Sequence, residues 1–218
     1  NLATSLHVLA IAYKDLGRVD EALAVEKEAL EIRERVLGQD HPHVSFSLTT
    51  LAELTLESGN PELAEPLLRR AVTVGRKAWN ELYPEVRWMK RMHASCLAEL
   101  GRVDEAEAIL TELLELTEVS GNEGAATPTL NALGRFYTDT NRWDEARRAL
   151  DKSLEIDERL YGPDHAYLIQ ALLALVDLDR KSGDTGLVDE HCSRVLRIAQ
   201  AELPVEDPER RAAESSCP

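Results

Sequence analysis

Aromatic side chains, cysteine and positive charge are all scarce in this chain of 218 residues. Aromatic residues make up 5% of it, but 44% is hydrophobic, which suits a soluble folded protein without a dense aromatic core. Lysine and arginine number 25 against 40 aspartates and glutamates, so the net charge is −15. Because phosphates repel such a chain, we expect no nucleic-acid partner and no docking on a membrane surface.

The cysteines exclude a further group of small folds. Cys96, Cys192 and Cys217 are odd in number and far apart, so we expect neither a disulfide framework nor a zinc module, and a reducing, cytoplasmic location. No apolar run approaches the roughly 20 residues that cross a bilayer. The chain opens with Asn-Leu-Ala-Thr, without an initiator methionine or a signal peptide, which indicates a segment of a longer protein.

What the chain does contain is a repeat. The stretch 16–22, Leu-Gly-Arg-Val-Asp-Glu-Ala, returns unchanged at 100–106, and looser copies follow the same spacing. The anchor residue of each copy is Gly17, Gly59, Gly101, Asn141 or Gly183, at intervals of 42, 42, 40 and 42 residues. A second element, Gly-x-Asp-His, recurs at 38–41 and 162–165. Each repeat therefore consists of two segments separated by two punctuated joints.

Both segments of each repeat have the apolar spacing of helices, and no strand is expected. The anchor glycine or asparagine can adopt the left-handed conformation that ends the first helix, helix A. The alanines that recur after the anchors, among them Ala106, are expected at close contacts between helix A and the second helix, helix B. The predicted helices are 2–16, 19–37, 43–58, 61–79, 85–100, 103–119, 128–140, 143–160, 167–182 and 185–201.

These motifs resemble the tetratricopeptide repeat, in the 42-residue form found in kinesin light chains and many bacterial proteins. The signature is matched in repeat 1 by Leu6, Leu9, Ala10, Tyr13, Gly17, Ala22 and Ala29, and in repeat 4 by Leu130, Leu133, Gly134, Tyr137, Ala146 and Leu150. The resemblance implies an all-α, right-handed solenoid of five repeats. HEAT repeats have a similar period of about 40–47 residues but lack the Gly-Arg-x-Asp-Glu-Ala turn.

The resemblance also implies the boundaries within one domain, 1–218. The repeats cover 2–43, 44–85, 86–126, 127–167 and 168–208, and 209–218 forms a tail or a cap. The joint at 120–126 is two residues short and rich in glycine, so we expect a hinge between blocks 1–119 and 127–218. Asp179 and Cys192 occupy positions that are usually apolar, which predicts an irregular fifth repeat. Uncapped repeat ends leave self-association open.

No constellation of residues predicts catalysis. His93 and Cys96 have the i, i+3 spacing of a base and a nucleophile, but the repeat register places both at inward packing positions. The acidic and histidine clusters at 40–43 and 189–192 offer too few convergent ligands for a metal. Phosphate loops, dinucleotide fingerprints and nucleophile elbows are missing. We therefore predict no enzyme, no metal site and no cofactor.

Binding is predicted on one stripe of the first helices. In the tetratricopeptide register, four positions of each helix A face a concave groove, and across five repeats these twenty positions carry a net charge of +2 in a protein of −15. An acidic partner with apolar anchors would suit this groove. Asn131 matches the position of groove asparagines in kinesin light chains. The candidate partner-binding residues are Lys14, Trp88, Arg91, Asn131, Arg135 and Arg180.

The function that follows is a non-catalytic module which binds a protein or peptide partner in its groove. The alternative is a ligand-sensing or regulatory arm of a larger bacterial signalling protein or enzyme.

Overall fold

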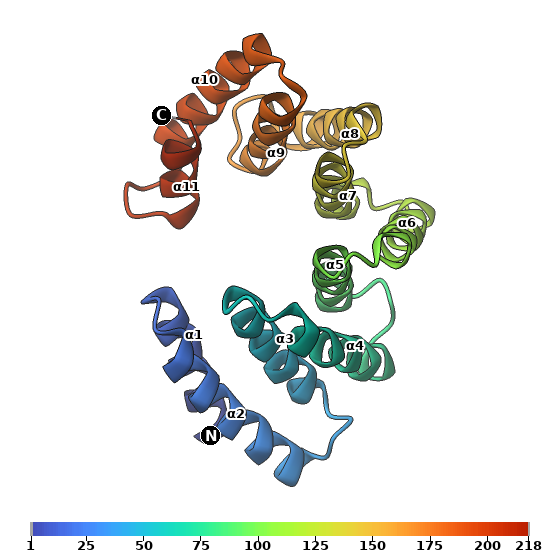
Figure 1. Cartoon of the computed structure of the whole chain (residues 1–218), viewed down its shortest axis with the longest axis vertical. Helices are drawn as coiled ribbons and strands as arrows, with labels where there is room; N and C mark the ends of the chain where they lie inside the picture. Colours follow the sequence, from blue (N-terminus) through green and yellow to red (C-terminus); the bar gives the residue numbers. More distant parts are fainter. Residues whose placement is uncertain (1, 218) are drawn as a thin grey trace. The chain divides into compact units, whose positions relative to one another are not determined.

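The computed structural model describes residues 2–217, and no strand occurs within that range (Figure 1). The α-helices are α1 Leu2–Asp15, α2 Val19–Leu37, α3 Pro42–Glu57, α4 Pro61–Ala78, α5 Pro84–Glu99, α6 Val103–Val119, α7 Thr127–Asp139, α8 Trp143–Tyr161, α9 Leu168–Ser182, α10 Thr185–Glu202 and α11 Pro208–Ser216. A short 3-10 helix, η1, covers Glu123–Ala125. The first ten α-helices match the ten predicted ranges to within one residue at each end.

The helices form two compact units, Asn1–Ile109 and Leu110–Pro218. In the first unit α1 packs on α2, and α3 packs on α4. Helix α2 also contacts α3, and α4 also contacts α5, so each second helix meets the first helix of the following repeat. In the second unit α7 packs on α8 and α9 on α10, while α8 contacts α9. Each unit is therefore built from consecutive helix hairpins, as the repeat predicts.

The turns inside the hairpins have the backbone conformation that the anchors predict. Gly17, Gly59, Gly101 and Gly183 all have positive φ, between 70° and 88°. Asn141 has φ 58° and is the one non-glycine residue within 2–217 in this region of conformational space. Glycine and asparagine are the residues that adopt the left-handed conformation at low cost, which is why the anchors recur.

The alanines after the anchors are fully buried on the second helices of their hairpins. Ala22, Ala64, Ala106 and Ala146 are all 0% exposed. A larger side chain at these positions would hold the two helices of a hairpin apart, because protein interiors are packed without free space. The predicted register of helix B is therefore confirmed.

Proline marks the joints between repeats. Helices α3, α5 and α11 begin at Pro42, Pro84 and Pro208, where a missing N–H costs nothing. Asp207 Oδ1 accepts a hydrogen bond of 2.8 Å from the N–H of Glu209 and so caps α11. Helix α11 thus starts at a joint like those that precede the earlier first helices.

The short joint at 120–126 is folded. Asn122 Oδ1 accepts a hydrogen bond from the N–H of Ala125 within η1, and η1 contacts both α7 and α8. Glu123 forms an ion pair of 2.7 Å with Arg159 of α8. The predicted hinge at this joint remains a prediction.

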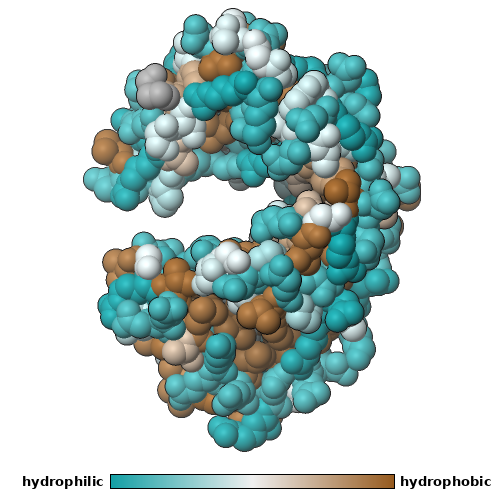
Figure 2. Space-filling model, viewed as in Figure 1, coloured by the Kyte–Doolittle hydropathy of each residue, from teal (hydrophilic) through white to brown (hydrophobic). Residues whose placement is uncertain are grey.

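The exposed side of α1 is unusually apolar. Leu2, Val8 and Leu9 of α1 and Leu16 directly after it are between 40% and 70% exposed, and the space-filling view shows brown surface among the teal in the region of α1 to α3 (Figure 2). Contiguous apolar surface is typical of faces that pack against another chain or repeat. Self-association through a repeat end remains a prediction.

Candidate functional site

Lys14, the first of the predicted binding residues, is already paired within its own unit. Its Nζ lies 2.9 Å from Glu53 Oε2 and 3.5 Å from Glu57 Oε1, so it links α1 to α3. Burial acts to lower the pKa of Lys14, but the hydrogen bond and the charge of Glu53 outweigh it and raise that pKa above its ordinary value. Lys14 therefore offers a partner little unbalanced positive charge.

Trp88 contributes to the core of the first unit as well as to the predicted stripe. It is partly buried and packs against the cluster that contains Val44, Leu48, Ala71 and Met89. Much of its indole is therefore engaged in packing α5 against the preceding repeat. A partner could contact only the remaining edge of the ring.

Arg91 differs from the other predicted cations. It lies one turn after Arg87 on α5 and is partly buried, and among residues 2–217 no carboxylate or other acceptor is paired with it. Burial, followed by the positive charge of Arg87, lowers the pKa of the Arg91 guanidinium to about 10. It is still protonated at neutral pH, so a desolvated positive charge lacks a partner, which is an unfavourable state for a folded protein.

Asn131 in the second unit, like Arg91 in the first, has a polar group without a partner within residues 2–217. It is 9% exposed on α7, and its Oδ1 is buried without a hydrogen-bond partner in the described part of the chain. A buried amide oxygen usually has a donor, and the lack of one costs about 1–3 kcal/mol. Because this oxygen has almost no accessible surface, a ligand could supply the missing N–H only after the Asn131 side chain rotates.

Arg135 follows Asn131 by one turn of α7. Its Nη2 donates a hydrogen bond of 2.9 Å to Gln170 Oε1 on α9. The Arg135 side chain is exposed, and the negative charges of Asp177 and Asp139 act on its guanidinium. Arg135 is therefore partly balanced by its own unit, in contrast to Arg91.

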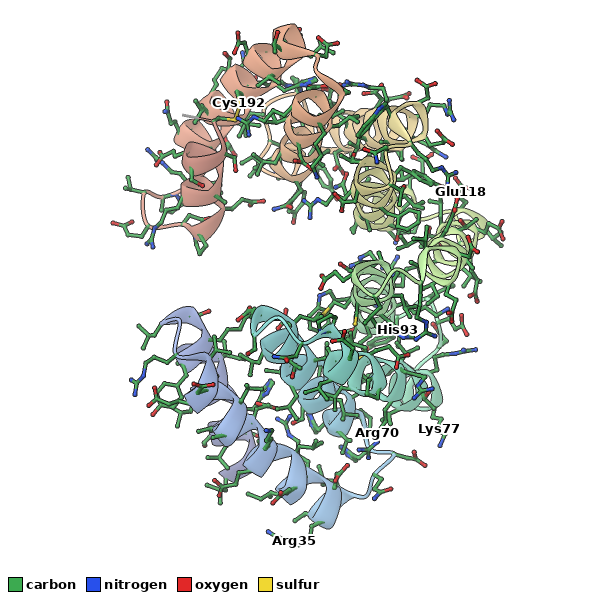
Figure 3. All side chains as sticks on the ribbon, viewed as in Figure 1. Arg35, Arg70, Lys77, His93, Glu118 and Cys192 are labelled. Carbon is green, nitrogen blue, oxygen red and sulfur yellow. A yellow bond between two sulfur atoms is a disulfide. The ribbon has the colours of Figure 1, made fainter. Side chains whose placement is uncertain are left out.

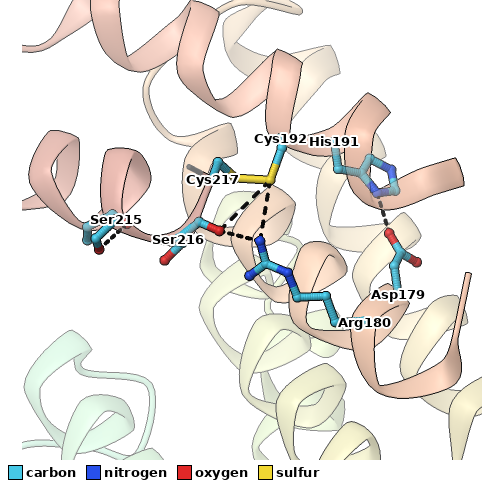
Figure 4. Close-up of a disulfide and its surroundings, with 8 residues drawn as sticks. Asp179, Arg180, His191, Cys192, Ser215, Ser216 and Cys217 are labelled. Atoms are coloured by element: carbon cyan, nitrogen blue, oxygen red, sulfur yellow. Dashed lines mark hydrogen bonds and ion pairs between the residues drawn. A yellow bond between two sulfur atoms is a disulfide. The ribbon is translucent and has the colours of Figure 1, made fainter. Parts of the chain in front are cut away.

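Arg180 is occupied by the C-terminal helix. Its Nη2 donates a hydrogen bond to the carbonyl oxygen of Ser216, at the end of α11, and lies 3.9 Å from Cys192 Sγ (Figure 4). A cation at a helix C-terminus satisfies carbonyl groups that have no partner within the helix. In this structure Arg180 holds α11 and does not present a free guanidinium to a partner.

The expectation of no disulfide is wrong. Cys192 and Cys217 form one, with their Cα atoms 5.2 Å apart (Figure 4). Cys192 is 42 residues after Leu150 and Cys217 is 42 residues after Leu175, and both leucines are fully buried. The repeat register therefore contained the signal that both thiols point inward at neighbouring helices.

Three carboxylate and histidine pairs between neighbouring helices were also missed. Each joins a carboxylate that is at most 8% exposed to a histidine on an adjacent helix. The nitrogen and oxygen atoms are 2.9 Å apart for His7 and Glu26, 3.3 Å for His93 and Glu65, and 2.6 Å for His191 and Asp179, the last pair being drawn in Figure 4. Asp179 also pairs with Arg147 of α8, which explains an acid at a position that is usually apolar.

His93 and Cys96 do not form a catalytic pair. The His93 ring is paired with Glu65, whereas Cys96 Sγ donates to the carbonyl oxygen of Pro61 at 3.4 Å. Cys96 is fully buried, and burial raises the pKa of its thiol to about 11. Since the thiolate is the nucleophilic form, this sulfur is inert at neutral pH, as the prediction of a core position requires.

We expect iodoacetamide at pH 8 to leave Cys96 unmodified in the folded protein. After reduction without denaturant, intact mass and peptide mapping should show alkylation at Cys192 and Cys217 alone. In urea all three cysteines should react. Rapid alkylation of Cys96 in the folded chain would contradict its placement in the core.

Two kinds of feature are missing from residues 2–217. Nowhere in this range do three or more histidine, cysteine, aspartate or glutamate side chains converge as they would around a metal ion. The same range contains no helix with the length and apolar character needed to span a bilayer.

Comparison with known proteins agrees with the hairpin geometry. Two family profiles, both described as Tetratricopeptide repeat, match residues 2–43 and 124–201. Protein KINESIN LIGHT CHAIN-RELATED 1 of Arabidopsis thaliana is 24% identical over 189 residues, which cover 87% of this chain and 31% of that protein. KINESIN LIGHT CHAIN-RELATED 3 of the same plant is 22% identical, over 88% of this chain and 30% of its own length. The chain thus spans less than a third of these relatives.

Solved structures share the fold at low identity. A Podosopora anserina kinesin light chain with nearly identical TPR-like repeats has a TM-score of 0.73 at 21% identity and covers 91% of this chain and 94% of its own. A Rap protein complexed with competence and sporulation factor also has a TM-score of 0.73, at 15% identity, over 89% of this chain and 53% of its own. This chain belongs to the tetratricopeptide repeat family, as shown by the matched profiles together with the anchors of positive φ and the buried signature alanines.

Proposed function

We propose that this chain is a non-catalytic interaction module that binds an acidic peptide segment along the stripe of its first helices. The observation that carries the proposal is Arg91, a desolvated guanidinium that no carboxylate balances within residues 2–217. A carboxylate from a partner would form charge-assisted hydrogen bonds with it, and Arg can make two in parallel. The partner would thereby remove a cost that the folded chain otherwise bears.

Asn131 supports a peptide as the class of partner. An extended peptide presents N–H groups at regular intervals, and one of them could donate to Asn131 Oδ1, which has no donor in the described part of the chain, once the amide rotates to expose that atom. The fold neighbour complexed with competence and sporulation factor shows that a protein of this architecture can hold such a factor.

The test is a binding screen with short synthetic peptides of varied charge, followed by fluorescence anisotropy on the tightest binders. We expect these binders to carry carboxylates and to weaken as salt is raised. Arg91→Glu should reduce their affinity at least about tenfold, because a favourable pair at a partly buried position becomes a repulsive one. Arg135→Glu should have a smaller effect, since Gln170 and nearby acids already engage that arginine.

Arg35 provides a matched control. It is exposed on α2, a second helix, outside the stripe (Figure 3). Arg35→Glu changes the net charge as Arg91→Glu does, so any general repulsion of acidic peptides would affect both variants equally. Equal affinity of wild type and Arg91→Glu for every peptide would refute the proposal.

A regulatory arm is the second candidate, because the chain spans less than a third of its curated relatives. In that case the stripe would bind a segment of the same longer protein. Peptides taken from that protein would then outcompete the synthetic binders. The cytoplasmic location, the bacterial source and the lack of a nucleic-acid partner remain predictions.

A further inference from the structure

The C-terminal helix α11 is an unusual element of the second unit. It begins at Pro208, in line with the prolines that open α3 and α5, but it ends after nine residues. Isolated helices shorter than about 12–15 residues are marginal in water. Contacts with α9 and α10 must therefore hold α11 in its helical form.

Apolar packing contributes little to those contacts. Within α11 only Ala213 is buried, and Cys217 directly follows the helix and is 3% exposed. The preceding first helix, α9, buries nine residues, most of them leucine, isoleucine or valine. Because the hydrophobic stabilisation of a helix scales with the apolar area it buries, α11 is stabilised by packing far less than α9 is.

Polar groups of α9 and of α11 itself supply further contacts, among them a hydrogen bond of 3.0 Å that Arg210 Nη1 donates to the carbonyl oxygen of Leu203. Gln170 Nε2 donates a hydrogen bond of 2.5 Å to Glu209 Oε1, and Arg180 donates to the carbonyl oxygen of Ser216. Gln170, Arg180 and Ser216 are partly or wholly exposed to water, where such bonds are weak. The covalent bond between Cys192 and Cys217 is a stronger tether than any of these hydrogen bonds, and Figure 4 shows it beside Arg180.

We propose that the Cys192–Cys217 disulfide is a redox latch that keeps α11 over the end of the stripe. When the latch is closed, Gln170 and Arg180 are occupied by the chain's own C-terminal helix. When it is open, α11 detaches and both side chains become available.

A dithiol is the class of reductant that opens the latch. One of its thiolates attacks Cys192 Sγ, which is the more exposed sulfur, and Cys217 leaves as a thiolate. The second thiol then attacks the mixed disulfide and releases Cys192. Two electrons pass to the protein, its two thiolates take up the two protons of the dithiol, and the reductant becomes a disulfide.

Hydrogen exchange on the whole chain, with and without dithiothreitol, tests the opening. We expect amides in 208–217 to exchange at least about tenfold faster after reduction, while amides of α9 keep their protection. The Cys192→Ser, Cys217→Ser double variant should exchange rapidly in both conditions. Cys96→Ser is the matched control and should respond to dithiothreitol as wild type does. Unchanged exchange of 208–217 after reduction would overturn the proposal.

Arginine modification tests the release of Arg180 without any partner. Phenylglyoxal should modify Arg180 several-fold faster in the reduced chain, and the exposed Arg35 should react at the same rate in both forms. Equal modification of Arg180 in both forms would show that α11 stays in place, and would also overturn the proposal.

A gain in partner affinity on reduction is the consequence that rests on the proposed function. It would be measured with the acidic peptides of the binding screen, and Arg180→Gln should abolish the gain. If those peptides fail to bind at all, the proposed function fails, while exchange and arginine modification still decide whether the latch exists.

Discussion

Replacing Glu26 with glutamine should lower the free energy of unfolding by about 3 kcal/mol, measured by urea denaturation. Glu26 is 0% exposed on α2, and its Oε1 lies 3.9 Å from Arg33 Nη1. Arg33 is itself 4% exposed and donates to Ser47 Oγ and to the carbonyl oxygen of His43. The amide would keep the shape of the side chain but remove the negative charge that lies beside the buried guanidinium of Arg33 and pairs with His7.

The pKa of Arg33 gives the direction of this effect. Burial lowers that pKa, and the charge of Glu26 acts to raise it. Without Glu26 the desolvation of Arg33 is no longer offset, so the folded state loses stability relative to the unfolded chain. Glu28→Gln, on the exposed side of the same helix, is the control and should change stability by less than about 0.5 kcal/mol.

A double variant separates charge from shape. Replacing a buried ion pair by apolar residues of similar volume is often neutral, whereas removing one partner is costly. Glu26→Leu with Arg33→Met should therefore lose less stability than the sum of the two single variants, by at least about 1 kcal/mol. Simple additivity would contradict the interpretation that these two charges stabilise each other.

Gly134→Ala should destabilise the chain by about 2 kcal/mol, although the same change usually stabilises a helix by about 1 kcal/mol. A Cβ at this position of α7 would lie 2.4 Å from both Cγ and Cδ2 of Leu150 on α8. Leu150 is fully buried, so it cannot move aside without disturbing the core of the second unit. Thermal and urea denaturation would both report the loss.

Gly186→Ala is the control for this variant. Gly186 lies near the start of α10, and the nearest atom to its added Cβ would be Asp184 Oδ1 at 3.9 Å, an ordinary contact. The alanine should therefore stabilise the chain by roughly 0.5–1 kcal/mol. If both alanines stabilise, the close approach of α7 and α8 at Gly134 is not a constraint on this fold.

The sequence by itself determined the hairpins. Three features follow from properties of single residues or of one helix turn. They are the positive φ of Gly17 and Asn141, the prolines that begin α3 and α5, and the burial of Ala22 and the three alanines in the same register. Such properties are local, so a repeat that presents them several times predicts the helices and their register to within a residue. The family follows from the same pattern.

Only the tertiary structure decided which stripe residues have partners. Lys14 meets Glu53 from 39 residues away, and Arg180 meets the carbonyl oxygen of Ser216 from 36 residues away, whereas Arg91 meets no carboxylate within 2–217. The disulfide between Cys192 and Cys217 arises in the same way, across α10 and the end of α11. These contacts depend on how far one helix is shifted and rotated against the next, and differences of one or two ångströms decide whether two charged groups pair. Local chemistry carries no information at that precision, because packing of the whole core sets the distances between helices.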